Sequence, residues 1–314
     1  MPEGEHRLGR SIWAEVHGPV HVVDFGGRGR PLVLVHGLGH SYSSWLAAAP
    51  QLAEHSRVIA IDLAGFGLTP LGRRSAAVDA NARLVGRVIE QLVREPAIMI
   101  GNSMGAVVSM LHARAQPASV AGLVLVNPGV PKPRPVRLDR DVQRLFASMA
   151  LPLVGEAAVR RRWERLGPEG LTREGLALCC VDPSRVTPDV RQAMIDTARS
   201  VANTPGAKKA YVEALRSLLP LLAAPDRYRR LIESVRQPVL LIHGKQDKLV
   251  PLASARAIAD QRPDWDLELM SDVGHVPQLE APGRFTALVR AWLDGRFTRP
   301  DGAPTADEGV PESG

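Results

Sequence analysis

The chain has 314 residues, of which 45% are hydrophobic and 23% charged, proportions typical of a folded globular protein. Its net charge of +6 comes from scattered side chains, nearly all arginine, without the aromatic-interleaved basic stripe of nucleic-acid binders, so we expect no nucleic-acid partner. Residues 1–18 lack the apolar core of a signal peptide, and no segment offers the ~18 consecutive apolar residues of a membrane span. We therefore expect a cytoplasmic protein without stable membrane insertion; its oligomeric state stays open.

Between residues 20 and 129, short apolar runs alternate with stretches of helical periodicity. Strands that are buried on both faces of a parallel sheet read as continuous runs of Val, Ile and Leu. Such runs lie at 20–25, 31–37, 57–65, 97–103 and 122–129. The helical stretches between them lie at 44–55, 78–93 and 104–116. This alternation predicts an α/β fold with a mostly parallel central sheet and helices on both faces.

The strand rhythm stops after Asn127, resumes with apolar runs that start at 238 and 265, and ends in an amphipathic helix at 284–295. The predicted domains are an α/β core of residues 1–129 and 236–295, an inserted helical cap or lid of residues 130–235, and a flexible tail of residues 296–314. Within the cap, we expect the apolar segment 215–225 to pack on the core, with an acyl pocket or a membrane contact as alternatives.

The two cysteines, Cys179 and Cys180, are adjacent in the sequence. Neighbours of this kind form only a strained disulfide ring, and no metal-type spacing surrounds them. We therefore expect free, partly buried thiols, and neither a metal nor a cofactor.

Residues 101–105 read Gly-Asn-Ser-Met-Gly, between an apolar run and a helical stretch. A nucleophile elbow of the G-x-S-x-G type needs this strand-turn-helix setting, because the turn lifts the serine hydroxyl above the sheet. The serine backbone is strained in such a turn, and side chains at Gly101 and Gly105 would crowd it. We therefore interpret Ser103 as a candidate nucleophile.

A serine hydroxyl needs a base that accepts its proton, and the base needs a third group that orients it. For this type of elbow, the partners follow in the order Ser, acid, His. Asp247 follows the apolar run that starts at 238, and His275 follows the one that starts at 265. Both lie past the carboxyl ends of predicted strands, where ligands of open α/β sheets bind. We therefore predict His275 as the base and Asp247 as the acid.

The other histidines fit the base less well. His112 lies inside the helix after Ser103, and His243 lies in a predicted strand end, so packing roles are expected for both. Histidines in polar or early segments, expected to be solvated or hydrogen-bonded surface groups, are His6, His17, His21 and His55.

Other candidates for the acid are weaker than Asp247. Asp272 shares the loop of His275, so a turn or capping role is expected, and Glu280 is expected to begin the last helix. The end of the run at 122–129 offers Asn127 and no carboxylate. Asp247 is therefore the best candidate by elimination.

The oxyanion that forms when a serine attacks a carbonyl needs two hydrogen-bond donors. One is assigned to the backbone N–H of Met104, the residue after the nucleophile. The other is assigned to the backbone N–H of Leu38, because Gly37 and Gly39 around it let the backbone approach a substrate closely. His36, which opens this glycine-rich stretch, is expected to tie the loop together by hydrogen bonds.

The motifs together resemble the α/β-hydrolase superfamily. The matching stretches are His-Gly-Leu-Gly at 36–39, Asp-Leu-Ala-Gly-Phe-Gly-Leu-Thr at 62–69, Gly-Asn-Ser-Met-Gly at 101–105, His-Gly-Lys-Gln-Asp at 243–247 and Gly-His-Val-Pro-Gln-Leu-Glu-Ala-Pro at 274–282. By this resemblance, Ser103, Asp247 and His275 match the nucleophile, acid and base. Asp62, with Gly65 and Gly67, matches a loop that is mainly structural in the family.

The resemblance implies hydrolysis of a carboxylic ester through an acyl-enzyme intermediate, with a small molecule that carries an apolar acyl group as substrate. Haloalkane dehalogenases and epoxide hydrolases of this fold use a carboxylate at the elbow, so Ser103 argues against their chemistry. The elbow also resembles that of C–C bond hydrolases of the meta-cleavage type, and Asn102 keeps this alternative open. Those enzymes usually carry an aromatic residue where this chain has Val276. A perhydrolase, lactonase, thioesterase or ligand receptor on the same fold stays a further alternative.

Overall fold

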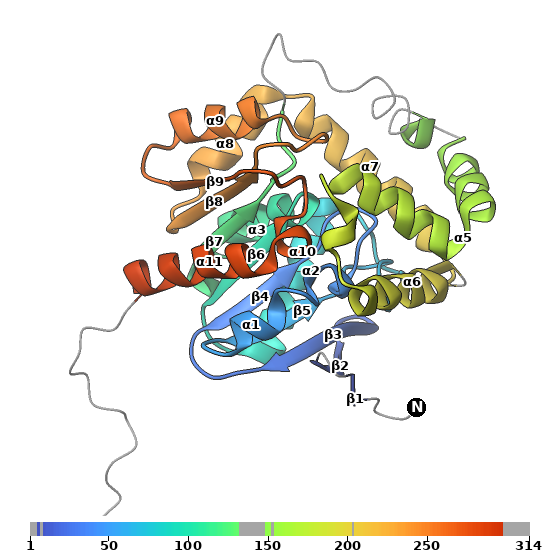
Figure 1. Ribbon diagram of the computed structural model, residues 1–314, viewed down its shortest axis with the longest axis horizontal. Coiled ribbons are helices and arrows are strands. Elements are labelled where there is room, and N and C mark those ends of the chain that lie inside the picture. The colour runs from blue at the N-terminus through green and yellow to red at the C-terminus, as the bar shows by residue number, and fades with distance from the viewer. Residues whose placement is uncertain (1–4, 7–8, 132–147, 152–153, 203, 298–314) are drawn as a thin grey trace, which may run out of the picture.

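A computed structural model describes residues 5–6, 9–131, 148–151, 154–202 and 204–297 of the chain (Figure 1). Within these residues, nine strands form one sheet in the order β1-β2-β3-β5-β4-β6-β7-β8-β9. The strands are β1 Glu5–His6, β2 Gly9–Glu15, β3 Pro19–Gly26, β4 Pro31–Val35, β5 Arg57–Ile61, β6 Ala97–Asn102, β7 Val120–Val126, β8 Val239–Gly244 and β9 Asp266–Met270. The first three strands pair antiparallel, β3 also pairs antiparallel with β5, and every pairing from β5 through β9 is parallel. The prediction of a mostly parallel sheet is confirmed.

The central strands β4, β6 and β8 are buried at every residue, as their continuous apolar sequences predict. Two separate apolar clusters cover the two faces of the sheet. One cluster is built with α2 Val78–Val88, α3 Met104–Ala115, α8 Pro225–Ser234 and α9 Leu252–Gln261, and the other with α1 Ala49–Ala53 and α11 Pro282–Phe297. Helices therefore lie on both faces, as predicted.

Short helical turns complete the core. The stretch predicted as one helix at 44–55 is divided into the 3-10 turn η1 Tyr42–Trp45 and α1, and the stretch at 78–93 continues from α2 into the π-helical turn η2 Ile89–Val93. The others are η3 Pro117–Ser119, η4 Pro183–Arg185 and α10 Pro277–Glu280.

Three long helices from the middle of the chain lie together at one end of the sheet, α5 Gly155–Cys179, α6 Pro188–Ala202 and α7 Ala207–Leu222 (Figure 1). The helix α5 is kinked where Gly167 takes φ +60° immediately before Pro168. The following helix α8 falls within the predicted cap range 130–235 but packs against α3 of the core. The domain boundaries themselves stay predictions.

The last helix extends further than the sequence pattern predicts. Arg296 and Phe297, assigned to the tail, belong to α11, and the Arg296 guanidinium pairs with the Asp266 carboxylate at 2.8 Å. The rest of the predicted tail, 298–314, lies outside the described residues. Across the parts of the chain that the structure describes, no helix combines the length and the apolarity that a bilayer crossing requires.

Candidate active site

Ser103 occupies the turn between β6 and α3. Its backbone takes φ +54° and ψ −114°, a conformation that side-chain-bearing residues rarely adopt. A Cβ on Gly101 would lie 2.5 Å from the carbonyl carbon of Gly105, and a Cβ on Gly105 would overlap the carbonyl of Val35. Only glycines therefore fit on either side of the turn, as predicted for a strained elbow.

His275 and Asp247 meet beyond the carboxyl ends of β9 and β8. The His275 Nδ1–H donates to Asp247 Oδ2 at 2.7 Å, and the carboxylate is fully buried. The backbone N–H groups of Leu249 and Val250 donate to the other carboxylate oxygen at 2.7 and 3.0 Å. This arrangement fixes the orientation of the imidazole.

Burial alone would raise the pKa of Asp247, because it disfavours the charged carboxylate. The opposing charge and hydrogen bond of His275, the nearby His243 and the N–H of Val250 outweigh burial and hold the Asp247 pKa below its ordinary value. Asp247 is therefore an anion at neutral pH, as a group that orients an imidazole must be.

Asn127 supports the same carboxylate. Its side-chain amide donates to Asp247 Oδ2 at 2.7 Å, and its carbonyl oxygen accepts from the backbone N–H of Gly244 at 3.3 Å. Asn102, the neighbour of Ser103, donates its side-chain N–H to the backbone carbonyls of Val126 at 3.2 Å and His275 at 3.0 Å. Asn127 therefore links Asp247 to β8, and Asn102 links the turn of Ser103 to β7 and to the backbone of His275.

Ser103 and His275 line the same cavity. Within the described residues, no hydrogen bond joins the Ser103 hydroxyl to the His275 imidazole. Hydrogen bonds of this kind are often long in unliganded enzymes and tighten when substrate binds. The structure thus brings the three predicted residues to one place, with the His–Asp contact formed.

The loop that carries Leu38 lies directly beside Ser103. A Cβ on Gly37 would lie 3.2 Å from Ser103 Cβ, so this glycine allows the close approach. His36 donates from Nδ1 to the carbonyl of Gly37 at 2.8 Å and accepts at Nε2 from the N–H of Leu63 at 3.1 Å. His36 therefore ties the loop, as predicted. Met104 opens α3, where the first backbone N–H groups have no partner within the helix.

Asp62 anchors the backbone on both sides of it, at residues 42 and 68. Its buried carboxylate accepts the backbone N–H groups of Tyr42 at 2.7 Å and Leu68 at 2.8 Å, and the Nδ1–H of His21 at 2.8 Å. The expectation of a surface position for His21 is wrong, because its side chain is fully buried. Ser11 Oγ lies 2.6 Å from His21 Nε2, so Ser11, His21 and Asp62 form a hydrogen-bonded Ser–His–Asp chain away from Ser103. None of these three residues lines the cavity.

The other rejected candidates have structural partners. His112 Nε2 contacts Ser119 Oγ at 2.9 Å, and His243 Nε2 donates to the Val250 carbonyl at 3.1 Å. Asp272 takes φ +53° in the turn before His275, and pairs with arginines of η4 and α11. Packing and turn roles are confirmed for these three.

Glu280 differs from its predicted role as the start of the last helix. It ends α10, and its fully buried carboxylate accepts the backbone N–H groups of Gly274 at 2.8 Å, Val181 at 2.9 Å and Asp182 at 2.8 Å. The His275 N–H donates in turn to the Cys179 carbonyl at 2.6 Å. The segment after α5 is therefore bonded directly to the loop of His275, which no local pattern in the sequence indicates.

The two cysteines lie in this junction. Both are free and buried, as predicted, and burial raises the pKa of both thiols, that of Cys180 to about 12. Their thiols are therefore protonated at neutral pH.

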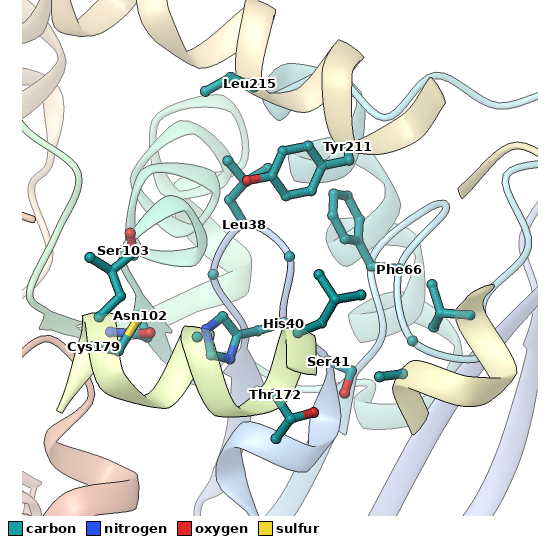
Figure 2. A pocket seen from close by; sticks show the side chains of 18 of the residues that line it. Leu38, His40, Ser41, Phe66, Asn102, Ser103, Thr172, Cys179, Tyr211 and Leu215 are labelled. Atoms are coloured by element: carbon teal, nitrogen blue, oxygen red, sulfur yellow. The ribbon is translucent and has the colours of Figure 1, made fainter. Parts of the chain in front are cut away.

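The cavity between the sheet end and the long helices has a volume of about 570 Å³ (Figure 2). Most of its wall is apolar, and the segment 215–225 contributes Leu215, Leu218, Leu219 and Leu222 from α7. Two polar residues that sequence reasoning passed over, His40 and Tyr211, also line it. His40 directly follows the glycine-rich loop, so its position was a usable signal; Tyr211 belongs to α7, far away in sequence.

Comparison with known proteins identifies the family. The model of the alpha/beta hydrolase family matches residues 32–288. The chain is 31% identical to the pimeloyl-[acyl-carrier protein] methyl ester esterase of Aromatoleum aromaticum, over 84% of this chain and 98% of the relative. It is 28% identical to the 2-hydroxy-6-oxo-6-(2'-aminophenyl)hexa-2,4-dienoic acid hydrolase of Metapseudomonas resinovorans, over 86% of each chain.

A longer relative and a solved structure agree with this match. The chain covers 65% of the dihydrolipoyllysine-residue acetyltransferase component of the acetoin cleaving system of Pseudomonas putida, at 29% identity over 86% of this chain. A thermophilic esterase from Thermogutta terrifontis has the same fold, with a TM-score of 0.67 at 24% identity over 91% of this chain and 98% of that chain. From the match that spans most of its length, this chain belongs to the alpha/beta hydrolase family.

Proposed function

We propose that the protein is a serine hydrolase that cleaves a carboxylic ester, with Ser103 as nucleophile, His275 as base and Asp247 as the group that orients the base. The observation that carries this proposal is the 2.7 Å bond between His275 Nδ1 and Asp247 Oδ2, on a histidine that shares one cavity with Ser103. That bond leaves the His275 Nε2 free to accept the serine proton.

The proposed reaction has two halves. Ser103 Oγ attacks the ester carbonyl while His275 takes its proton, and the oxyanion is held by the backbone N–H groups of Leu38 and Met104. His275 then protonates the departing alcohol, which leaves an acyl group on Ser103. Water, activated by the same imidazole, attacks this acyl-enzyme and releases the acid. In this scheme the His275 imidazole accepts and returns the proton in both halves of the reaction.

The cavity favours a substrate with an apolar acyl group. Leucines of α7 and the side chains of Met149 and Phe66 line it, so an alkyl chain gains free energy by leaving water there. An ester substrate also agrees with the methyl ester esterase to which the chain is similar. We propose that α5, α6 and α7 act as a cap that closes this cavity over the substrate.

Hydrolysis of a C–C bond is the second candidate, supported by the similarity to a hydrolase of a hexadienoic acid derivative. The position of Asn102 in the motif is the feature that resembles C–C bond hydrolases. The Asn102 amide, however, donates to the Val126 and His275 carbonyls, so Asn102 gives this candidate little support. Ester hydrolysis therefore stands first.

A panel of p-nitrophenyl acyl esters of increasing length, beside one vinylogous C–C hydrolase substrate, tests the choice. We expect turnover of the esters, and Ser103→Ala should lower kcat/KM by about 10⁴-fold because the nucleophile is lost. Ester turnover by Ser103→Ala above one hundredth of the wild-type rate, or turnover of the C–C substrate alone, would contradict ester hydrolysis at Ser103.

A further inference from the structure

The polar side chains that line the cavity divide into two groups, those with a hydrogen-bond partner in the protein and those without. Ser41 and Ser43 bond to each other, Thr172 and Thr197 donate to carbonyls of their own helices, Asn102 bonds to two backbone carbonyls, and Arg162 pairs with Glu174 at 2.7 Å. His275 is held by Asp247. In the described part of the chain, the side chains of Ser103, His40, Tyr211 and Trp163 have no such partner. The Trp163 ring lies under the Lys208 ammonium at 5.1 Å, and the proposed reaction uses Ser103, which leaves His40 and Tyr211 unexplained.

His40 lies at the end of the loop that carries the proposed oxyanion donor Leu38, and Tyr211 reaches this loop from α7. Gly39, with φ +75°, brings the cap helix close, because a Cβ there would lie only 3.0 Å from Tyr211 Cε2. Figure 2 shows the hydroxyl of Tyr211 directed toward Leu38 and the imidazole of His40 near the base of the same loop. A carbonyl bound at the Leu38 N–H would therefore have both groups nearby.

We propose that His40 and Tyr211 form a polar subsite that binds an uncharged hydrogen-bonding group, such as a hydroxyl or keto group, on the substrate close to its scissile carbonyl. This inference rests on the proposed function and specifies its substrate class. Polar groups that face an apolar cavity cost free energy unless a ligand supplies their hydrogen bonds, so a substrate that does so gains over one that does not.

The protonation states of the two residues agree with an uncharged group. Burial, with contributions from His36 and His275, lowers the pKa of His40 to about 4, so the imidazole is neutral at pH 7. Burial raises the pKa of Tyr211 to about 12, so its hydroxyl remains a donor. Arg162, the guanidinium in the cavity wall, is already paired with Glu174. A carboxylate on the substrate would therefore find no free cation among the described lining residues.

Three esters of one alcohol test the subsite: p-nitrophenyl butyrate, p-nitrophenyl 3-hydroxybutyrate as separate enantiomers, and mono-p-nitrophenyl succinate. For the wild-type protein we expect kcat/KM for one hydroxybutyrate enantiomer to exceed that for butyrate by at least about fivefold, the effect of one net hydrogen bond. Succinate should be the poorest of the three.

Substitutions then assign the preference to the two residues. In Tyr211→Phe, and separately in His40→Phe, the hydroxybutyrate-to-butyrate ratio should fall to within about twofold of one. Thr172→Val is the matched control, since the Thr172 hydroxyl lines the same cavity but donates to the Pro168 carbonyl. Its ratio should equal that of the wild type. Because Tyr211→Phe removes one oxygen atom only, it tests the subsite even if His40→Phe fails to fold.

The outcomes separate the two proposals. Turnover of butyrate without a preference for either hydroxybutyrate, or a preference for succinate, would overturn the subsite and leave the esterase intact. A preference that survives both substitutions would also overturn it. Turnover of none of the three esters would overturn the proposed function, and the subsite with it.

Discussion

The backbone of Ser103 is held in a conformation that costs free energy, and its neighbours show how. Gly101 and Gly105 carry no Cβ, and a Cβ at either position would collide with nearby backbone atoms. The Ser103 N–H donates to the Val126 carbonyl at 2.9 Å. Non-glycine residues in such conformations persist only where the surroundings over-determine them, and they concentrate at functional sites. The five-residue motif, in its setting between an apolar run and a helical stretch, predicted this strain, because side chains at the two glycine positions would crowd the turn.

The Asp247 carboxylate, the proposed acid, has two side-chain partners on one oxygen. Asn127 Nδ2 and His275 Nδ1 both donate to Asp247 Oδ2, each at 2.7 Å, so the end of β7 reaches the same oxygen as the imidazole. A carboxylate at position 127 would therefore lie within reach of His275.

Moving the acid tests this geometry. Asp247→Asn should lower kcat/KM for p-nitrophenyl butyrate by about 10⁴-fold, because the imidazole loses its anionic partner. Adding Asn127→Asp to this variant should raise kcat/KM at least about tenfold above that of Asp247→Asn alone. Gln246→Asp in the Asp247→Asn background is the control, because Gln246 is exposed, and it should recover nothing. Equal rates for the two double variants would show that position 127 does not reach His275.

Sequence reasoning at this scale succeeded where the chemistry follows from local order and failed where it depends on contacts between distant segments. Ser103, Asp247 and His275 each follow an apolar run and were found from that position. Tyr211 reaches the site only because α7 folds back over the loop at 36–40, a contact that no local pattern in the chain records.

Among the elements, the junction between α5 and the loop of His275 stands out. Glu280 accepts the N–H groups of Val181 and Asp182, which follow α5, and that of Gly274 in the loop of His275, and the Cys179 carbonyl accepts the His275 N–H. The geometry of His275 therefore depends on where α5 ends. Neither the length of α5 nor its kink at Gly167 follows from apolar periodicity, which is weak in this helix.

Glu280→Gln tests this junction. The glutamine NH₂ group would face backbone N–H groups that now donate to the carboxylate, and donors cannot pair with donors. We therefore expect the free energy of unfolding to fall by about 2 kcal/mol and kcat to fall as well. Urea denaturation gives the first quantity and p-nitrophenyl butyrate hydrolysis the second. Glu268→Gln on the exposed side of β9 is the control and should stay within about 0.5 kcal/mol of the wild type. An unchanged denaturation midpoint in Glu280→Gln would refute the assigned role.

At the scale of the whole molecule, the alternation of apolar runs was enough to predict the sheet and its covering helices. Buried parallel strands need apolar residues on both faces, so their sequences carry the architecture directly. The amphipathic pattern of the 215–225 segment shows only that it has an apolar side. That this side both packs on the core and lines the cavity required the three-dimensional arrangement of α7.

Among the described residues, two sets of Ser, His and Asp lie together. Ser11, His21 and Asp62 are hydrogen-bonded in series, and His275, which is bonded to Asp247, lines the same cavity as Ser103. His21 and Asp62 are fully buried and line no part of the cavity, whereas Ser103 and His275 face it. A serine nucleophile must reach a substrate carbonyl, and of Ser11 and Ser103 only Ser103 lines the cavity.

Labelling with a fluorophosphonate, followed by intact-mass measurement and peptide mapping, tests this claim most directly. We predict that the wild-type protein and Ser11→Ala each take up one label on Ser103, with loss of esterase activity in proportion, and that Ser103→Ala takes up none. A wild-type protein that does not react, or a label that persists in Ser103→Ala, would contradict the assignment of Ser103 as the nucleophile.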